Sequence, residues 1–232
     1  MIHLEKVTKQ YDNNSYTDEF GVKNITLEID SGEFVFFVGK SGAGKSTLLK
    51  LITKDINPTS GDICVSNLLL SQLGQKQLPY YRRIFGIITK EIGLLENKTV
   101  YENLELVMRV TQQPTKTIKE KIPKALGLVG IKQKMYVYPS ELSEGERFKV
   151  LMARAVVNNP LIVVADEPTA NLDYETAWDI MNIFNDINKL GTTVLIATHA
   201  TQLVTVMKKR VITIRDGRIL SDVTKGKYGR VL

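Results

Sequence analysis

The stretch Phe34-Val35-Phe36-Phe37-Val38-Gly39-Lys40-Ser41-Gly42-Ala43-Gly44-Lys45-Ser46 decides the fold of this chain. Its apolar part, Phe34–Val38, contains no polar alternation, which is typical of a strand that is buried on both faces. The residues after it match the phosphate-binding pattern G-x-x-x-x-G-K-[ST] at every position, and Ser46–Ile52 predicts the start of a helix. The alternative is a glycine-rich strand–helix turn with no ligand.

Each part of this loop has a physical reason. Glycines let backbone N–H groups converge on phosphate oxygens without interference from Cβ atoms, and the N-terminus of the following helix favours negative charge. Lys45 is expected to reach the β- and γ-phosphates of a nucleotide, and Ser46 to offer its hydroxyl to Mg²⁺. The predicted nucleotide-binding residues of this segment are Gly39, Lys40, Ser41, Gly42, Ala43, Gly44, Lys45, Ser46 and Thr47.

A second apolar run ends in two acids. Leu161–Ala165 predicts a buried strand, and Asp166 and Glu167 follow it directly. Because a parallel strand brings its carboxyl end to the ligand crevice of an open sheet, Asp166 is expected to bind Mg²⁺ directly or through water. Glu167, expected on the opposite side of the strand, would polarise an attacking water. The alternative is that both acids are solvated loop residues.

The rest of the chain alternates between strand and helix patterns, which predicts an α/β fold with a mostly parallel sheet and helices on both faces. Further strands are expected at Lys23–Ile29 and Thr192–Ala197, a helix at Glu175–Leu190, and a closing hairpin at Val211–Ile214, Asp216-Gly217 and Arg218–Leu220. From about residue 91 to 159 the pattern is helical, with candidates Tyr101–Val110, Ile118–Leu128 and Glu144–Val157, punctuated by Pro114, Pro123 and Pro139. A helical insertion therefore splits the sheet domain in sequence.

Composition sets limits on the function. No apolar stretch approaches the roughly 18–20 residues that span a bilayer, and the first residues lack the apolar core of a signal peptide, so a cytosolic location is the default expectation. The net charge is +6, with local density at Lys116–Lys134 and Lys208–Arg218. No aromatic residues interleave with these lysines and arginines, so nucleic acid is not expected as a partner. The basic residues form a solvated surface or lie near acidic lipid.

Four further segments complete a family resemblance. Leu142-Ser143-Glu144-Gly145-Glu146 looks like the signature L-S-G-G-E/Q, Pro168–Asp173 resembles the segment ending in the D-loop, and Thr198-His199 looks like the H-loop. Tyr11 stands where an aromatic residue stacks on adenine. Together with the phosphate loop and the two acids, these motifs resemble the nucleotide-binding subunits of ABC transporters over nearly the whole chain.

The resemblance implies a P-loop ATPase that forms one cassette, residues 1–232, with an N-terminal antiparallel β part and a helical subdomain inserted at about 91–159. It implies a head-to-tail homodimer that binds two ATP molecules with Mg²⁺, each held between the phosphate loop of one subunit and the signature of the other. The catalytic residues would be Glu167, His199 and Lys45. The nucleotide contacts added by the resemblance are Tyr11, Lys90, Ser143, Gly145, Glu146 and Asp173.

Several of these residues also have simpler explanations. Ser143 and Glu146 fit the capping box S-x-x-E, which opens a helix without any ligand. His199 alone would be a packed histidine at a strand end, and Tyr11 alone a core or surface tyrosine.

Other stretches, among them Thr99–Asn103 and Ala155–Pro160, resemble the cell-division branch of the family, whose ATPase works with an integral membrane subunit. The chain is then expected on the inner face of the cell membrane, held there through that partner. The alternatives are the ATPase of a lipoprotein-release or peptide-export transporter, and a soluble regulatory module with little turnover.

Two positions depart from the family pattern. Lys90 stands where the Q-loop glutamine is expected, and Glu144 replaces the first signature glycine. Arg147-Phe148 also replaces the usual glutamines after the signature. These changes predict slow hydrolysis with nucleotide binding retained. Because the two charges are opposite, we hypothesise that Lys90 of one subunit and Glu144 of the other compensate each other near the same γ-phosphate; independent drift in a slow ATPase is the alternative.

Overall fold

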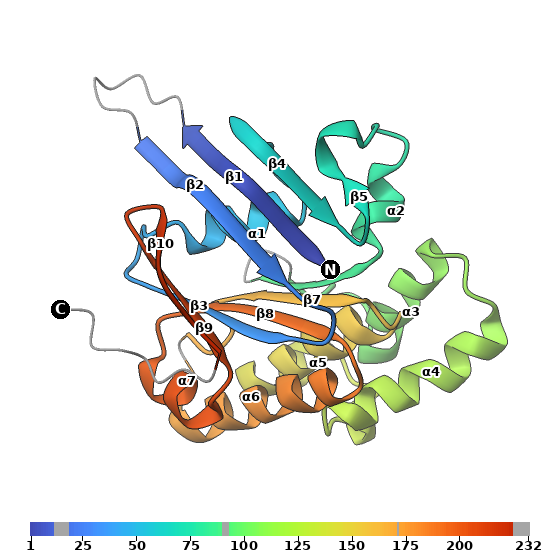
Figure 1. The fold of residues 1–232 in the computed structure, drawn as a ribbon. Coiled ribbons are helices and arrows are strands. Elements are labelled where there is room, and N and C mark those ends of the chain that lie inside the picture. The colour runs from blue at the N-terminus through green and yellow to red at the C-terminus, as the bar shows by residue number, and fades with distance from the viewer. Residues whose placement is uncertain (12–18, 90–92, 171, 225–232) are drawn as a thin grey trace.

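The computed structural model describes residues 1–11, 19–89, 93–170 and 172–224, and these form two β-sheets with helices (Figure 1). The larger sheet has the strand order β10-β9-β3-β8-β7-β6 and is parallel except for β10, which pairs antiparallel with β9. Its strands are β3 (Phe34–Val38), β6 (Phe85–Ile88), β7 (Ile162–Asp166), β8 (Thr193–Thr198), β9 (Arg210–Arg215) and β10 (Arg218–Val223). The predicted α/β class and mostly parallel core sheet are confirmed.

The smaller sheet is antiparallel and has the order β2-β1-β4-β5, as expected for the N-terminal part. Its strands are β1 (Ile2–Tyr11), β2 (Glu19–Ile29), β4 (Ser60–Val65) and β5 (Leu68–Leu69). In Figure 1 this sheet lies across one face of the larger sheet, with α1 (Lys45–Ile52) between the two. The phosphate loop, which precedes α1, therefore lies where the two sheets meet.

Strand β3 divides its side chains between two hydrophobic cores. Phe34, Phe36 and Val38 belong to the core shared with the helices, whereas Val35 and Phe37 belong to the core shared with α1 and the antiparallel sheet. All five are buried. Successive side chains on a strand point to opposite faces, so a strand covered on both faces must be apolar at every position.

The helices between β6 and β7 are α3 (Val100–Val110), α4 (Thr115–Leu128) and α5 (Glu144–Val156), close to the predicted positions. Their buried side chains belong to the same core as one face of the large sheet, together with those of α6 (Tyr174–Lys189) and α7 (Thr201–Met207). Pro123 lies inside α4, within the helix predicted at Ile118–Leu128. Pro114, in contrast, is the N-cap residue of α4, and Pro139 begins a short 3₁₀ turn. The short helix α2 (Leu78–Arg82) precedes β6.

The closing hairpin is confirmed, and it also supports the phosphate loop. Asp216 and Gly217 both have positive φ, as the tight turn between β9 and β10 requires. The Gly217 N–H donates to the Ala43 carbonyl at 3.0 Å, and its carbonyl accepts from the Lys23 N–H at 2.7 Å. The turn thereby joins the phosphate loop to β2.

Candidate active site

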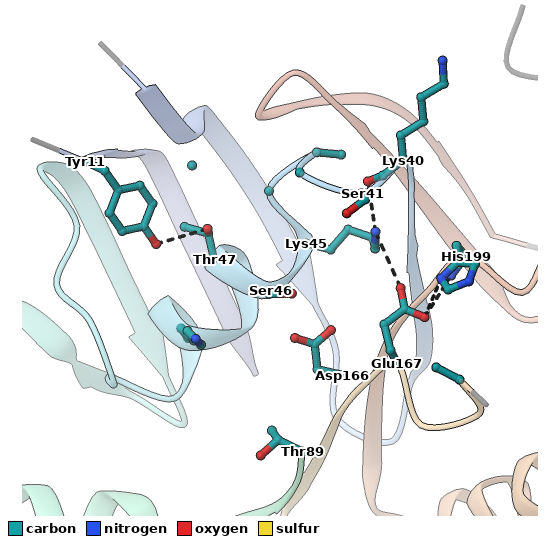
Figure 2. Close-up of a pocket in the computed structure, with 16 residues that line it drawn as sticks. Tyr11, Lys40, Ser41, Lys45, Ser46, Thr47, Thr89, Asp166, Glu167 and His199 are labelled. Carbon is teal, nitrogen blue, oxygen red and sulfur yellow. Dashed lines mark hydrogen bonds and ion pairs between the residues drawn. The ribbon is translucent and has the colours of Figure 1, made fainter. Parts of the chain in front are cut away.

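A cavity of about 810 Å³ lies at the carboxyl ends of β3, β6, β7 and β8. Parallel strands end at the same edge of a sheet, so residues far apart in sequence meet there. Figure 2 shows Tyr11 at one end of the cavity and His199 at the other. The lining residues are Tyr11, Gly21, Lys40, Ser41, Gly42, Ala43, Gly44, Lys45, Ser46, Thr47, Lys50, Thr89, Asp166, Glu167, Ala170 and His199.

The phosphate loop needs its glycines for both conformation and space. Gly39, Gly42 and Gly44 have φ values of 154°, 77° and 106°, in the region that favours glycine. A Cβ on Gly39 would lie 2.2 Å from the Ile214 carbonyl oxygen. Gly44 is also the N-cap residue of α1 and contributes no side-chain cap, so the first N–H groups of this helix remain available to an anion.

Lys45 is held against the loop that precedes it. Its Nζ donates to the carbonyl oxygens of Gly39 at 2.9 Å and Lys40 at 3.1 Å, and lies 3.8 Å from Glu167 Oε1. The side chain is only 7% exposed, so its charge faces the cavity and not bulk water. Gly39 does not line the cavity itself; it contributes the carbonyl that orients Lys45.

Glu167 and His199 form a contact pair. His199 Nδ1 lies 2.8 Å from Glu167 Oε2, and the His199 backbone N–H donates to the same oxygen at 3.3 Å. Glu167 has a left-handed backbone with φ 47°, and its N–H donates to the Ala197 carbonyl at 2.8 Å. The carboxylate is thus oriented from β8 and from Lys45, a geometry suited to holding a water for proton transfer.

Asp166 lines the same cavity on the side of Ser46 (Figure 2). The expectation that Glu167 points to the opposite side of the strand is therefore wrong: β7 ends at Asp166, and the left-handed backbone at Glu167 brings both carboxylates into one cavity. What distinguishes them is their partners. Asp166 Oδ1 is buried and has no hydrogen-bond partner among the described residues.

These residues fit a magnesium ion. A buried carboxylate oxygen without a partner next to a serine hydroxyl offers the hard oxygen ligands that Mg²⁺ prefers. Within the described parts of the chain, no group of three or more His, Cys, Asp or Glu side chains could hold a metal alone. Mg²⁺ bound here would therefore share its coordination with nucleotide phosphates, as Mg²⁺ usually does.

Tyr11, Gly21 and Thr47 line the end of the cavity that lies away from His199. The Tyr11 hydroxyl lies 3.2 Å from Thr47 Oγ1. Gly21 of β2 lines the cavity beside Tyr11 and Thr47. A Cβ at position 21 would lie 2.7 Å from both Tyr11 Cε2 and Thr47 Cγ2. The stacking of Tyr11 on adenine stays a prediction.

Sequence reasoning missed four lining residues: Gly21, Lys50, Thr89 and Ala170. Gly21 carried a usable signal, because a single glycine inside a strand often marks a close approach of another group. Lys50 lies one turn beyond the phosphate loop on α1, and Thr89 directly precedes the predicted Q-loop residue Lys90. Lys90 itself lies outside the described residues.

The signature does not contribute to this cavity within one chain. Ser143 is the N-cap residue of α5 and forms the predicted capping box with Glu146, which also pairs with Lys134 at 2.5 Å. Asp173 is the N-cap residue of α6 and accepts the Thr176 N–H at 2.9 Å. None of Ser143, Gly145, Glu146 and Asp173 lines the cavity. The chain therefore brings together the phosphate loop, both acids and His199, while the signature residues lie outside this cavity.

One departure from the family pattern has a clear structural role. Arg147 of α5 donates to the Pro139 carbonyl at 2.8 Å and to Glu96 Oε2 at 3.2 Å. The hydrogen bond from this guanidinium holds the pKa of Glu96 below its ordinary value. Arg147 therefore links the first turn of α5, which contains the signature, to the segment that contains Glu96.

A phosphate loop between a buried strand and a helix, beside an aspartate and a glutamate–histidine pair, defines a P-loop ATPase. A family model described as ABC transporter matches residues 22–170. The chain belongs to this family of ATP-binding cassettes.

Known proteins agree with this assignment. The chain is 42% identical to the cell division ATP-binding protein FtsE of Bacillus subtilis, over 99% of both chains. Among solved structures, it resembles a dimeric ATP-binding cassette in a post-hydrolysis state bound to ADP and phosphate, with a TM-score of 0.86 and 30% identity, covering 98% of this chain and 100% of the other. It also resembles CbiO1 of Clostridium perfringens, described as part of an ABC transporter complex, with a TM-score of 0.87 and 26% identity, covering 97% and 88%.

The protein is thus an ATP-binding, ATP-hydrolysing ABC subunit of the cell-division type. No helix in the described residues is both long and apolar enough to cross a bilayer.

Proposed function

We propose that MgATP drives closure of a head-to-tail homodimer, and that this closure acts on a membrane subunit. One observation carries the proposal: the signature residues Ser143 and Gly145 lie at the N-terminal end of α5 and do not line the cavity of their own chain. The capping box uses the N–H groups of Ser143 and Glu146, and those of Glu144 and Gly145 between them suit a phosphate anion. A second copy would supply that anion and would complete both sites at once. The dimeric cassette with ADP and phosphate supports this arrangement by similarity.

Each group near the phosphate loop has a distinct role in this mechanism. Lys45 would exchange its two loop carbonyls for phosphate oxygens, which are stronger acceptors because they are charged. Ser46 and Asp166 would hold Mg²⁺, which neutralises phosphate charge when bound. Glu167 would orient the attacking water and accept its proton, and His199 would hold Glu167 and reach the γ-phosphate. Loss of the γ-phosphate removes the bridge between subunits, and the dimer opens.

The partner we propose is an integral membrane subunit of the FtsX type, with a role in cell division and in the regulation of cell-wall hydrolysis. The FtsE relatives and the CbiO1 transporter complex support a membrane partner of this general kind. The protein would then be cytoplasmic and peripheral on the inner face of the cell membrane. Charge distribution is consistent with that place: residues 115–134 carry six Lys and one Glu, which gives +5 of the net +6 of the chain.

The experiment uses Glu167→Gln, which keeps the size of the side chain but removes the base. With saturating MgATP this variant should form a stable dimer, measured by size-exclusion chromatography with light scattering, while hydrolysis falls at least about 100-fold. Lys45→Ala in the same background is the control and should remain monomeric, because the γ-phosphate loses its anchor. A Glu167→Gln protein that binds MgATP and stays monomeric would contradict the closure mechanism. ATPase assays with and without the membrane partner then separate a motor from a regulatory module.

A further inference from the structure

The first turns of α5 and α6 are in tight contact. A Cβ built on Gly145 of α5 would lie 2.7 Å from Thr176 Cγ2 of α6, closer than real Cβ contacts allow. The next nearest atoms, Thr176 Oγ1 and Cβ, would lie at 3.9 and 4.0 Å, which is ordinary contact. Gly145 does not have positive φ, so its backbone would accept any residue. The Thr176 methyl group is therefore the group that a side chain at position 145 would displace.

Two other observations concern the surroundings of this contact. One turn further along both helices, Lys149 Nζ of α5 lies 3.7 Å from Asp179 Oδ2 of α6. In addition, the Thr176 backbone N–H donates to Asp173 Oδ1, which caps α6. Hydrogen bonds from Thr176 hold the pKa of Asp173 below its ordinary value. Thr176 thus contacts the signature with its methyl group and the expected D-loop aspartate with its amide.

We propose that Thr176 is a positioning residue that sets the spacing between the signature end of α5 and the capped start of α6. Gly145 is then a glycine because of this contact within its own chain. The inference rests on the proposed function, in which the signature closes over the nucleotide of a second subunit. Both helix ends would have to meet that nucleotide together, so their separation matters for closure.

The size of the effect follows from the distances. If Thr176 keeps its rotamer, relief of the 2.7 Å contact to the 3.4 Å of ordinary packing moves the two helix ends apart by about 0.7 Å. Misplacement of aligned groups by about 1 Å can cost up to about 100-fold. Gly145→Ala should therefore weaken ATP-dependent dimerisation by about 10-fold to 100-fold, although alanine is otherwise the better helix former.

The test measures the dimer dissociation constant with saturating MgATP in the Glu167→Gln background, by sedimentation velocity. Thr176→Ser removes only the methyl group that clashes with the new Cβ. The double variant Gly145→Ala with Thr176→Ser should therefore have a dimer dissociation constant within about threefold of that of the Glu167→Gln background. Thr176→Val keeps a methyl group at that place and should not rescue. Gly127→Ala in α4, where an added Cβ meets nothing within 4 Å, is the control for alanine in an open helical position.

The outcomes separate the two proposals. If the Glu167→Gln background does not dimerise, the proposed function fails first. If the background dimerises and Gly145→Ala dimerises equally well, the contact is without consequence and the inference is wrong. If Gly145→Ala is impaired and Thr176→Ser fails to rescue it, the glycine serves the partner's nucleotide directly and Thr176 is not a positioning residue. Melting temperatures of every variant identify any loss through unfolding.

Discussion

The surroundings of Asp166 predict that the variant Asp166→Asn is more stable than the wild-type protein and less functional. The buried Oδ1 of Asp166 has no hydrogen-bond partner among the described residues. An unsatisfied buried polar group costs about 1–3 kcal/mol, and a charge costs more than an amide. Without nucleotide, Asp166→Asn should therefore raise the free energy of unfolding by about 1–2 kcal/mol. For a chain of this length, 1 kcal/mol corresponds to a shift of about 2–4 °C in Tm.

With MgATP present, the wild-type protein should instead be more stable than Asp166→Asn. A ligand at 100 times its Kd stabilises the native state by about 2.7 kcal/mol. The wild-type protein should gain this stabilisation with MgATP and lose most of it when EDTA removes the metal. Asp166→Asn should respond little to Mg²⁺, because an amide is a weaker ligand than a carboxylate. The variant would then be the more stable protein alone and the less stable protein with MgATP.

The assay is differential scanning fluorimetry, supported by urea unfolding, in four conditions that combine ATP or no ATP with Mg²⁺ or EDTA. Asp186→Asn is the matched control, because Asp186 is half exposed and pairs with Lys189 at 2.7 Å. That variant should change stability by less than about 0.5 kcal/mol in every condition. The reasoning is refuted if Asp166→Asn is less stable than the wild type without nucleotide, or if its Mg²⁺-dependent stabilisation is unchanged.

Two further predictions concern the signature. Lys134, followed by the Ser143 amide, holds the pKa of Glu146 below its ordinary value of 4.5, so the stabilisation that Glu146 provides is complete above pH 4.5 and is lost as pH falls through its folded-state pKa. Urea unfolding of the wild type and Glu146→Gln should therefore differ at pH 6 to 7 and converge in acid; a constant difference would show that the charge is irrelevant. Separately, a double-mutant cycle on ATPase rate with Lys90→Gln and Glu144→Gly should show coupling of about 1–3 kcal/mol if the two charges compensate each other across the dimer, and additive effects would end that hypothesis.

Predictions from the sequence were accurate where the structure of a short segment is determined by interactions within that segment. The unbroken apolar run at β3 required cover on both faces, and the structure buries all five residues. The side chains of Ser143 and Glu146 each accept the other's backbone N–H, so the four residues Ser143–Glu146 were enough to predict the start of α5. The Asp216-Gly217 turn is equally local, since both residues tolerate positive φ.

Predictions failed where the outcome depends on what another segment contributes. The opposite orientation of Asp166 and Glu167 followed from strand alternation, which stops where β7 stops. Gly21 and Thr89 were missed because they line the cavity only once β2 and β6 lie beside the phosphate loop.

The sequence by itself determined the family, the order of strands and helices, and the identity of the groups that meet a phosphate, because glycine conformation, helix capping and apolar runs act over a few neighbouring residues. Tertiary structure alone decided that Asp166 Oδ1 lacks a partner among the described residues, that His199 pairs with Glu167, and that Gly145 packs against Thr176. These outcomes depend on distances of a few ångströms between segments separated by about 30 residues. Such distances are set by how the sheet and helices pack, and a linear pattern does not contain them.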